Sequence, residues 1–198
     1  AEPDRSVNGN GLQVFGTVTR EPVATGADLV GYSGFSDSNS LVQPYNPDLD
    51  FDTGDFCVMG WVKTANASDF RAILDRQEVA RSNQARITIS ITPDEVIRFF
   101  AGTNRYVDSS TIPTDTWVFY TCVVRNGVYE MYINGRYDAS VITGSPASVT
   151  NTSSVTGVGV LANQGGAATG TSLALFRISG TAPTAEQIAK IYRDEKPL

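Results

Sequence analysis

Residues 55–63 read Asp55-Phe56-Cys57-Val58-Met59-Gly60-Trp61-Val62-Lys63, and this stretch decides the fold class. Successive residues of a strand point to opposite faces. Here one face would carry Phe56, Val58, Gly60 and Val62, and the other Cys57, Met59 and Trp61. Both faces are apolar, so we expect a β-strand that is buried on both sides.

Short runs of the same kind, separated by turn residues, fill most of the chain. We expect further strands at 12–15, 17–19, 70–74, 86–92, 95–100, 116–124, 129–133, 155–161 and 172–178. In residues 86–91 isoleucine alternates cleanly with polar residues, which predicts one solvent-facing side. Asn134-Gly135 predicts a type I′ hairpin, because both residues tolerate positive φ, and Asn126-Gly127 predicts a second tight turn.

The C-terminal end is expected to be helical. Thr184 with Gln187 three residues later has the spacing of a capping box. Ile188, Ile191 and Tyr192 recur at i, i+3 and i+4, so they would form one apolar stripe that docks on the rest of the protein. Residues 1–198 are therefore predicted to be a single all-β domain, a two-sheet antiparallel jelly-roll sandwich with a short C-terminal helix. Closure into a barrel stays open as an alternative.

Composition excludes several classes of function. The net charge is −6, so the basic stripe that nucleic-acid binding needs is missing. The chain has no histidine, which removes the commonest general base and zinc ligand, and Ser-His-Asp or Cys-His catalysis within the chain. The sequence contains no long apolar run of the kind that predicts membrane insertion. Cys57 and Cys122 lie in separate strand-like runs and are expected as buried free thiols, with a bridge between the sheets as the alternative.

Four segments in this order resemble the laminin-G-like, concanavalin A-like jelly rolls. They are residues 55–63, 116–120, 131–135 and 175–192, the last containing Leu175-Phe176-Arg177-Ile178-Ser179 and Pro183-Thr184-Ala185-Glu186-Gln187-Ile188. Residues 45–51 and 190–198 look like the version found in bacteriophage tail proteins. The resemblance implies a tail fibre or tailspike domain that acts in the virion at the bacterial surface. Because the sequence ends in Lys196-Pro197-Leu198 directly after the predicted helix, we expect it to be a fragment of a longer chain.

The resemblance leaves three functions open. The first is a non-catalytic module that binds a bacterial surface glycan. The second is a structural or assembly domain that contacts other virion tail subunits. The third is a glycan-degrading enzyme, which the sequence disfavours because Glu78, Glu95 and Glu130 are isolated and show no Glu-x-Asp-x-Glu spacing.

Sugar binding needs an aromatic face surrounded by hydrogen-bonding side chains. Tyr106 is predicted as the stacking platform, with Arg76, Asn104 and Arg105 as its polar neighbours. The alternative is that Tyr106 packs on its own sheet. Trp61 and Trp117 are expected in the core, and Gln77, Glu78, Asn163 and Gln164 are further polar loop residues.

The acidic stretch Asp48-Leu49-Asp50-Phe51-Asp52-Thr53-Gly54-Asp55 is the candidate metal site. Calcium takes six to eight oxygen ligands, and Asp50, Asp52 and Asp55 would supply several. No other cofactor is predicted. The alternative is a strand with a solvated face, because Leu49 and Phe51 alternate with Asp50 and Asp52. No motif names the glycan, the host or the oligomeric state.

Overall fold

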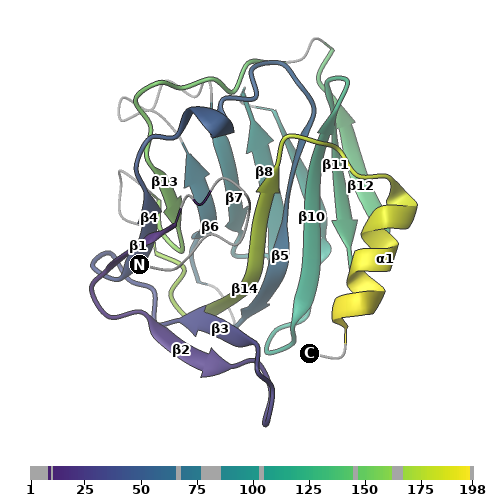
Figure 1. The fold of residues 1–198 in the computed structure, drawn as a ribbon. Helices are drawn as coiled ribbons and strands as arrows, with labels where there is room; N and C mark the ends of the chain where they lie inside the picture. The colour runs from purple at the N-terminus through teal and green to yellow at the C-terminus, as the bar shows by residue number, and fades with distance from the viewer. Residues whose placement is uncertain are drawn as a thin grey trace.

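The computed structural model describes residues 9, 11–65, 68–76, 86–102, 105–144, 147–161 and 167–196. Within them the strands form two seven-stranded antiparallel sheets that face each other, and one helix covers the outside of the second sheet (Figure 1). The predicted all-β, two-sheet architecture with a C-terminal helix is confirmed. None of the described helical residues belongs to a segment that is long and apolar enough to cross a membrane.

We call the first sheet the β8 sheet and the second the β5 sheet. In spatial order the β8 sheet consists of β1 (Gln13–Phe15), β4 (Ser40–Gln43), β13 (Thr156–Val158), β6 (Arg71–Arg76), β7 (Ile87–Ile91), β8 (Val96–Ala101) and β9 (Tyr106–Thr111). The β5 sheet consists of β12 (Arg136–Ile142), β11 (Val128–Ile133), β10 (Val118–Arg125), β5 (Phe56–Thr64), β14 (Thr171–Ser179), β3 (Val30–Ser33) and β2 (Thr19–Pro22). A 3₁₀ helix, η1 (Pro47–Leu49), and the α-helix α1 (Ala185–Glu195) complete the described elements.

Strand β5 is buried on both sides, as predicted. Phe56, Val58 and Val62 belong to the core between the sheets. Met59 and Trp61 belong to a second apolar cluster on the outer face, beneath α1. The helix is therefore what converts the exterior of the β5 sheet into a second core.

Helix α1 begins with the predicted capping box. The Gln187 amide donates to Thr184 Oγ1 at 3.3 Å, and the Thr184 amide donates to Gln187 Oε1 at 2.8 Å. Ile188 is fully buried, and the Tyr192 ring stacks 5.7 Å from the ring of Trp61. So short a helix is marginal by itself, and this packing on the sheet stabilises it.

Both predicted tight turns are confirmed. Asn134 and Gly135 have φ of 50° and 74°, and join β11 to β12. Asn126 and Gly127 have φ of 48° and 74°, and join β10 to β11. Two successive positive φ values are those of a type I′ turn, whose twist matches the flanking strands.

The predicted solvent-facing side of β7 is wrong. Thr88 and Ser90 are only 7% and 6% exposed, so every residue of the strand is buried. Thr88 donates to Asp75 on β6 at 2.9 Å, and it is paired with Phe100 on β8. Large and charged side chains on the two neighbouring strands thus cover the polar face, which one strand's own alternation does not reveal.

The acidic stretch of residues 48–55 forms no strand. The alternative interpretation of this stretch, a strand with a solvated face, is therefore also wrong. Pro47–Leu49 is the 3₁₀ helix η1, whose N-cap Asn46 accepts a hydrogen bond from the Asp48 amide at 3.0 Å. Asp52 then has φ of 50°, which belongs to a turn. Asn at the N-cap and Pro at the first helical position favour a helix start over an extended strand.

The predicted cysteine chemistry is confirmed, and the disulfide alternative is wrong. Cys57 and Cys122 are both buried free thiols on the neighbouring strands β5 and β10. Cys122 lies in the core between the sheets, whereas Cys57 lies in the second apolar cluster, beneath α1. Their side chains therefore point to opposite faces of the β5 sheet and cannot meet.

At one side of the sandwich the edge strands β9 and β12 are joined by side chains. The Ser110 amide and hydroxyl both donate to the Asp138 carboxylate at 2.6 Å. The two strands belong to different sheets and are not paired in either of them, so the described residues form a sandwich and not a closed barrel.

Candidate functional site

The outer face of the β8 sheet carries a cluster of aromatic and charged side chains. On β8 and β9, Phe99 and Val107 are paired and point into the core. Their neighbours therefore point outward, and the register places Arg98 opposite Asp108 and Phe100 opposite Tyr106. We call Phe70, Arg98, Phe100, Tyr106 and Asp108 the outer cluster.

Arg98 is the centre of the outer cluster. Its Nε and Nη2 atoms donate to the two carboxylate oxygens of Asp108, both at 2.7 Å. Chiefly because of this hydrogen bonding, the pKa of Arg98 is raised above its usual value, although partial burial opposes the shift. The bidentate pair fixes the planar guanidinium of Arg98, whose side chain is partly exposed at the surface.

Two exposed aromatic rings flank this guanidinium. Its Cζ atom lies 4.0 Å from the centroid of Tyr106 and 5.9 Å from that of Phe70. Tyr106 is 43% exposed and Phe70 48% exposed. Rings of this kind next to fixed planar polar groups are what a pyranose needs for stacking and for hydroxyl hydrogen bonds.

Tyr106 also packs on its own sheet, as the alternative predicted. Its ring centroid lies 5.2 Å from that of Phe100. The guanidinium of Arg86 stacks on Phe100 at 3.8 Å, and burial lowers the pKa of Arg86, opposed by the charge of Asp75. The outer cluster therefore rests on a layered support that holds Tyr106 in place while leaving much of its ring exposed.

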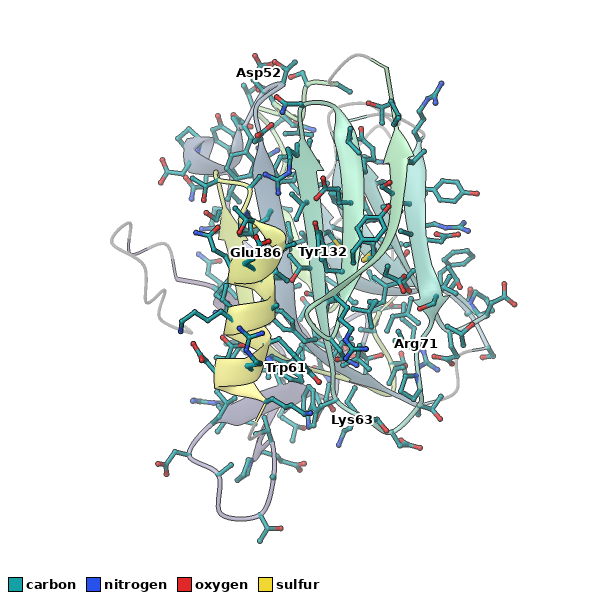
Figure 2. The ribbon with its side chains drawn as sticks, turned by 90° about the vertical axis from the view of Figure 1, so that its right-hand side faces the viewer. Asp52, Trp61, Lys63, Arg71, Tyr132 and Glu186 are labelled. Carbon is teal, nitrogen blue, oxygen red and sulfur yellow. The ribbon has the colours of Figure 1, made fainter. Side chains whose placement is uncertain are left out.

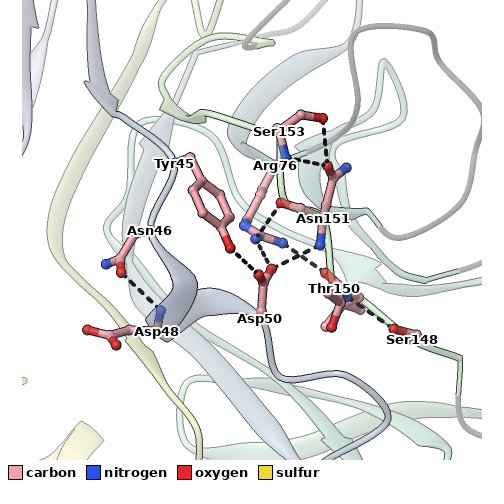
Figure 3. Close-up of polar contacts among 10 residues, drawn as sticks. Tyr45, Asn46, Asp48, Asp50, Arg76, Ser148, Thr150, Asn151 and Ser153 are labelled. Carbon is pink, nitrogen blue, oxygen red and sulfur yellow. Dashed lines mark hydrogen bonds and ion pairs between the residues drawn. The ribbon is translucent and has the colours of Figure 1, made fainter.

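The prediction that Arg76 lies at the surface beside Tyr106 is wrong. Arg76 is 1% exposed and forms an ion pair with Asp50. It also donates to the backbone carbonyls of Val149 at 2.8 Å and Asn151 at 3.2 Å (Figure 3). A guanidinium is buried only where charge and hydrogen bonds compensate it, and here the two loops around residues 50 and 150 supply both. Arg76 is a structural residue.

The other predicted neighbours have mixed outcomes. Arg105 is exposed and donates to the Ile142 carbonyl at 3.3 Å, so it lies at the rim beside Tyr106. Asn104, Gln77, Glu78, Asn163 and Gln164 lie outside the described residues. The prediction for Tyr106 and Arg105 as ligand contacts remains a prediction.

The structure separates the three predicted calcium ligands. Asp50 accepts from Tyr45 Oη at 2.8 Å, from the Asn151 amide at 2.9 Å and from Arg76 (Figure 3). Asp55 accepts from the Asn126 amide at 2.8 Å, and Asp52 is exposed in its turn. Among the described residues no three Asp, Glu, Cys or His side chains gather as a metal site requires. The geometry therefore gives the calcium prediction no support.

Sequence comparison with family models decides the family. Residues 36–189 match the model of the concanavalin A-like lectin/glucanases superfamily. This chain belongs to that superfamily. Among curated proteins, no sequence matches the chain. The jelly-roll resemblance inferred from the four sequence segments is thus confirmed for most of the chain.

Solved structures with the superfamily fold include binding domains of clostridial toxins. The binding domain of paraclostridial mosquitocidal protein 1 has a TM-score of 0.75 at 16% identity, covering 97% of this chain and 49% of that one. The receptor-binding domain of botulinum neurotoxin C/D mosaic serotype has a TM-score of 0.72 at 18% identity, covering 98% and 48%. A botulinum neurotoxin DC binding domain in complex with SialylT has a TM-score of 0.72 at 16% identity, covering 97% and 48%. The chain therefore spans about half the length of these domains.

The superfamily also includes glucanases, whose chemistry requires two carboxylates on either side of the scissile bond, roughly 5–9.5 Å apart. Glu130 on β11 of the β5 sheet accepts from Tyr132 Oη at 3.0 Å and from Arg125 Nε at 3.4 Å. Glu95 lies in the turn between β7 and β8 of the opposite sheet. These two described glutamates therefore do not form a dyad, and Glu78 lies outside the described residues.

Sequence reasoning missed Phe70, Arg98 and Asp108. The signal was present as two short alternations, Arg98-Phe99-Phe100 and Tyr106-Val107-Asp108, each with an apolar residue between two outward ones. Matching them requires the register of β8 against β9, which follows from the turn between the strands and not from either strand alone.

Proposed function

We propose that this domain is a non-catalytic module that binds a bacterial surface glycan through the outer cluster. The observation that supports the proposal is the guanidinium of Arg98, fixed by Asp108 between two half-exposed aromatic rings. The rings would stack on the apolar face of a sugar, and the fixed polar groups would form hydrogen bonds with its hydroxyl groups. The non-catalytic prediction agrees with the similar solved structures, which are described as binding domains.

The setting we propose is a bacteriophage tail fibre or tailspike, where other tail subunits would be its neighbours. This rests on the resemblance of residues 45–51 and 190–198 to tail proteins, whereas the similar structures named above are toxin domains. A single shallow sugar site binds weakly, so useful affinity would arise from repeated copies on one particle.

Four variants test the site. Tyr106→Ala, Phe70→Ala and Arg105→Ala change the outer cluster and its rim, and Tyr137→Ala removes an equally prominent tyrosine, 59% exposed, on β12 of the other sheet. After folding is checked by circular dichroism, each is measured on a bacterial glycan array and for adhesion to host cells. We expect Tyr106→Ala and Phe70→Ala to lower binding about 3- to 10-fold each, Arg105→Ala to lower it less, and Tyr137→Ala to leave it unchanged.

The outcomes separate the rival functions. Full binding by the well-folded Tyr106 and Phe70 variants would remove the outer cluster as the site. If the unmodified domain binds no glycan and no host cell, the assembly-domain function is favoured instead. Release of shortened glycan products would contradict the non-catalytic proposal.

A further inference from the structure

A hollow lies on the outside of the β5 sheet, on the opposite sheet from the outer cluster. It is lined by residues of four strands and by the residue that precedes β10: Glu21, Pro22, Gly31, Ser33, Lys63, Ser172 and Trp117. Figure 2 shows Lys63 near the lower end of the sheet, past the part of it that α1 covers. The hollow has a volume of about 30 Å³, which exceeds the roughly 10–15 Å³ that one water molecule needs, so a small substituent of a ligand can enter it.

The strand register explains why these side chains meet. Val62 and Leu173 point into the core, so their neighbours Lys63 and Ser172, which are paired with each other, point outward. Glu21 is paired with Gly31 on the next pair of strands. Alternation thus places one cation, one carboxylate and hydroxyl groups on the same small area of the sheet.

Gly31 and Trp117 form the apolar part of the hollow. A Cβ atom at position 31 would lie 3.1 Å from Cη2 of Trp117, tighter than ordinary contact, so glycine there lets the indole lie low on the sheet. The indole is anchored, because Trp117 Nε1 donates to the Val23 carbonyl at 3.2 Å. The Lys63 ammonium lies 5.5 Å from the centroid of the indole.

We infer that this hollow binds the acetamido group of an N-acetylated sugar. An acetamido group has a methyl, a carbonyl oxygen and an N–H group within four heavy atoms. The half-buried indole of Trp117 would contact the methyl. The Lys63 ammonium would donate to the carbonyl, and the Glu21 carboxylate or a serine hydroxyl would accept from the N–H. The inference extends the proposed glycan binding to a second surface, and it does not depend on Tyr106.

The two tryptophans of the chain supply a direct test by ¹⁵N NMR of the indole N–H groups. Trp117 lines the hollow, whereas Trp61 is 4% exposed and its indole N–H donates a hydrogen bond to Glu195. Titration with N-acetylglucosamine should move the Trp117 signal saturably and leave the Trp61 signal in place. Glucose, which lacks the acetamido group, should move neither signal. No saturable shift up to about 50 mM, or an equal shift with glucose, would overturn the inference.

Matched variants locate the effect. Lys63→Met removes a charged hydrogen bond and should weaken binding about tenfold, and Glu21→Gln should weaken it less. Lys190→Met is the control, because that lysine lies on α1 with its side chain 69% exposed. Unchanged affinity in Lys63→Met would contradict the proposed contact. Tyr106→Ala should leave the Trp117 response intact, and its loss in that variant would assign the shift to the outer cluster, so the two proposals fail separately.

Discussion

The indole nitrogen of Trp61 donates to the Glu195 carboxylate at 2.8 Å, although the two residues are 134 positions apart in the chain. Arg177 binds the same carboxylate at 2.6 Å. Trp61 is on β5 and Glu195 is the last residue of α1, so this contact ties the end of the helix to the middle of the sheet. The N–H of a buried indole needs such an acceptor.

Glu195→Ala should therefore loosen α1. It leaves the Trp61 N–H buried without its acceptor and Arg177 without its carboxylate, which should lower the free energy of unfolding by about 1–3 kcal/mol. Urea denaturation and hydrogen exchange of the α1 amides measure the effect. Asp194→Ala is the control, since its ion pair with Lys190 is exposed and should contribute at most about 0.5 kcal/mol. Equal stability of the two variants would contradict the proposed role of the Glu195 contact.

Gly135→Ala should destabilise the protein by more than the ordinary cost of positive φ. That cost alone is about 1 kcal/mol, but a Cβ here would also lie 2.8 Å from Cβ of Tyr192 on α1. Gly26→Ala isolates the backbone cost, because Gly26 has φ of 79° and nothing near its Cβ position. We expect a lower melting temperature in both variants and a clearly larger decrease in Gly135→Ala. A Gly135→Ala variant as stable as Gly26→Ala would show that α1 can shift away from the added Cβ without a loss of stability.

Asn134→Ala, at the same turn, removes a residue that carries positive φ well and whose Oδ1 accepts from the Phe119 amide at 3.0 Å. It should cost about 1–2 kcal/mol, measured by the same melts. An unchanged melting temperature would mean that neither the turn conformation nor this hydrogen bond contributes measurably.

The Asp50–Arg76 pair should make stability depend on acid pH. Burial raises the pKa of Asp50, but hydrogen bonds from the Asn151 amide, Tyr45 and Arg76 outweigh it, so the pKa in the folded protein is below its ordinary value. A carboxyl with a depressed folded pKa contributes stability above its unfolded pKa, about 3.9, and loses it as pH falls through the folded pKa.

Asp50→Asn should therefore be destabilised at pH 7, by about 3 kcal/mol, because Arg76 remains buried without a counter-charge. Between pH 4 and pH 2 it should lose less stability than the unmodified protein. Urea titrations at several pH values measure this difference, with Asp52→Asn as the control for an exposed carboxyl. Parallel pH curves for the unmodified protein and Asp50→Asn would show that Asp50 is not the linked group.

Both cysteines should react with a thiol reagent, but only after the protein unfolds. Burial raises the pKa of Cys57 to about 11, opposed by the charge of Arg177, and burial also raises the pKa of Cys122 well above its usual value. Because the thiolate is the reactive form, a thiol reagent at pH 8 should react with the native protein at least about a hundredfold more slowly than in denaturant. Non-reducing denaturant should release two thiols, and finding none would mean that a disulfide exists.

Local sequence determined the elements whose energetics are local. The alternation of residues 55–63, the Asn-Gly turns and the capping box of Thr184 and Gln187 each act within about ten residues, and each is present in the structure. Neighbouring side chains and backbone preferences decide such features, so they can be inferred before any fold is known.

The tertiary structure decided which side chains meet. Arg76 was predicted as a polar neighbour of Tyr106, yet Asp50 and the backbone around residue 150 bury it. Arg98 was recognised as the centre of the outer cluster only from the register of β8 and β9, which places it opposite Asp108. A slip of one residue in that register would turn every side chain of the strand to the other face. Burial and strand register depend on contacts between distant segments, and the sequence around either residue does not contain them.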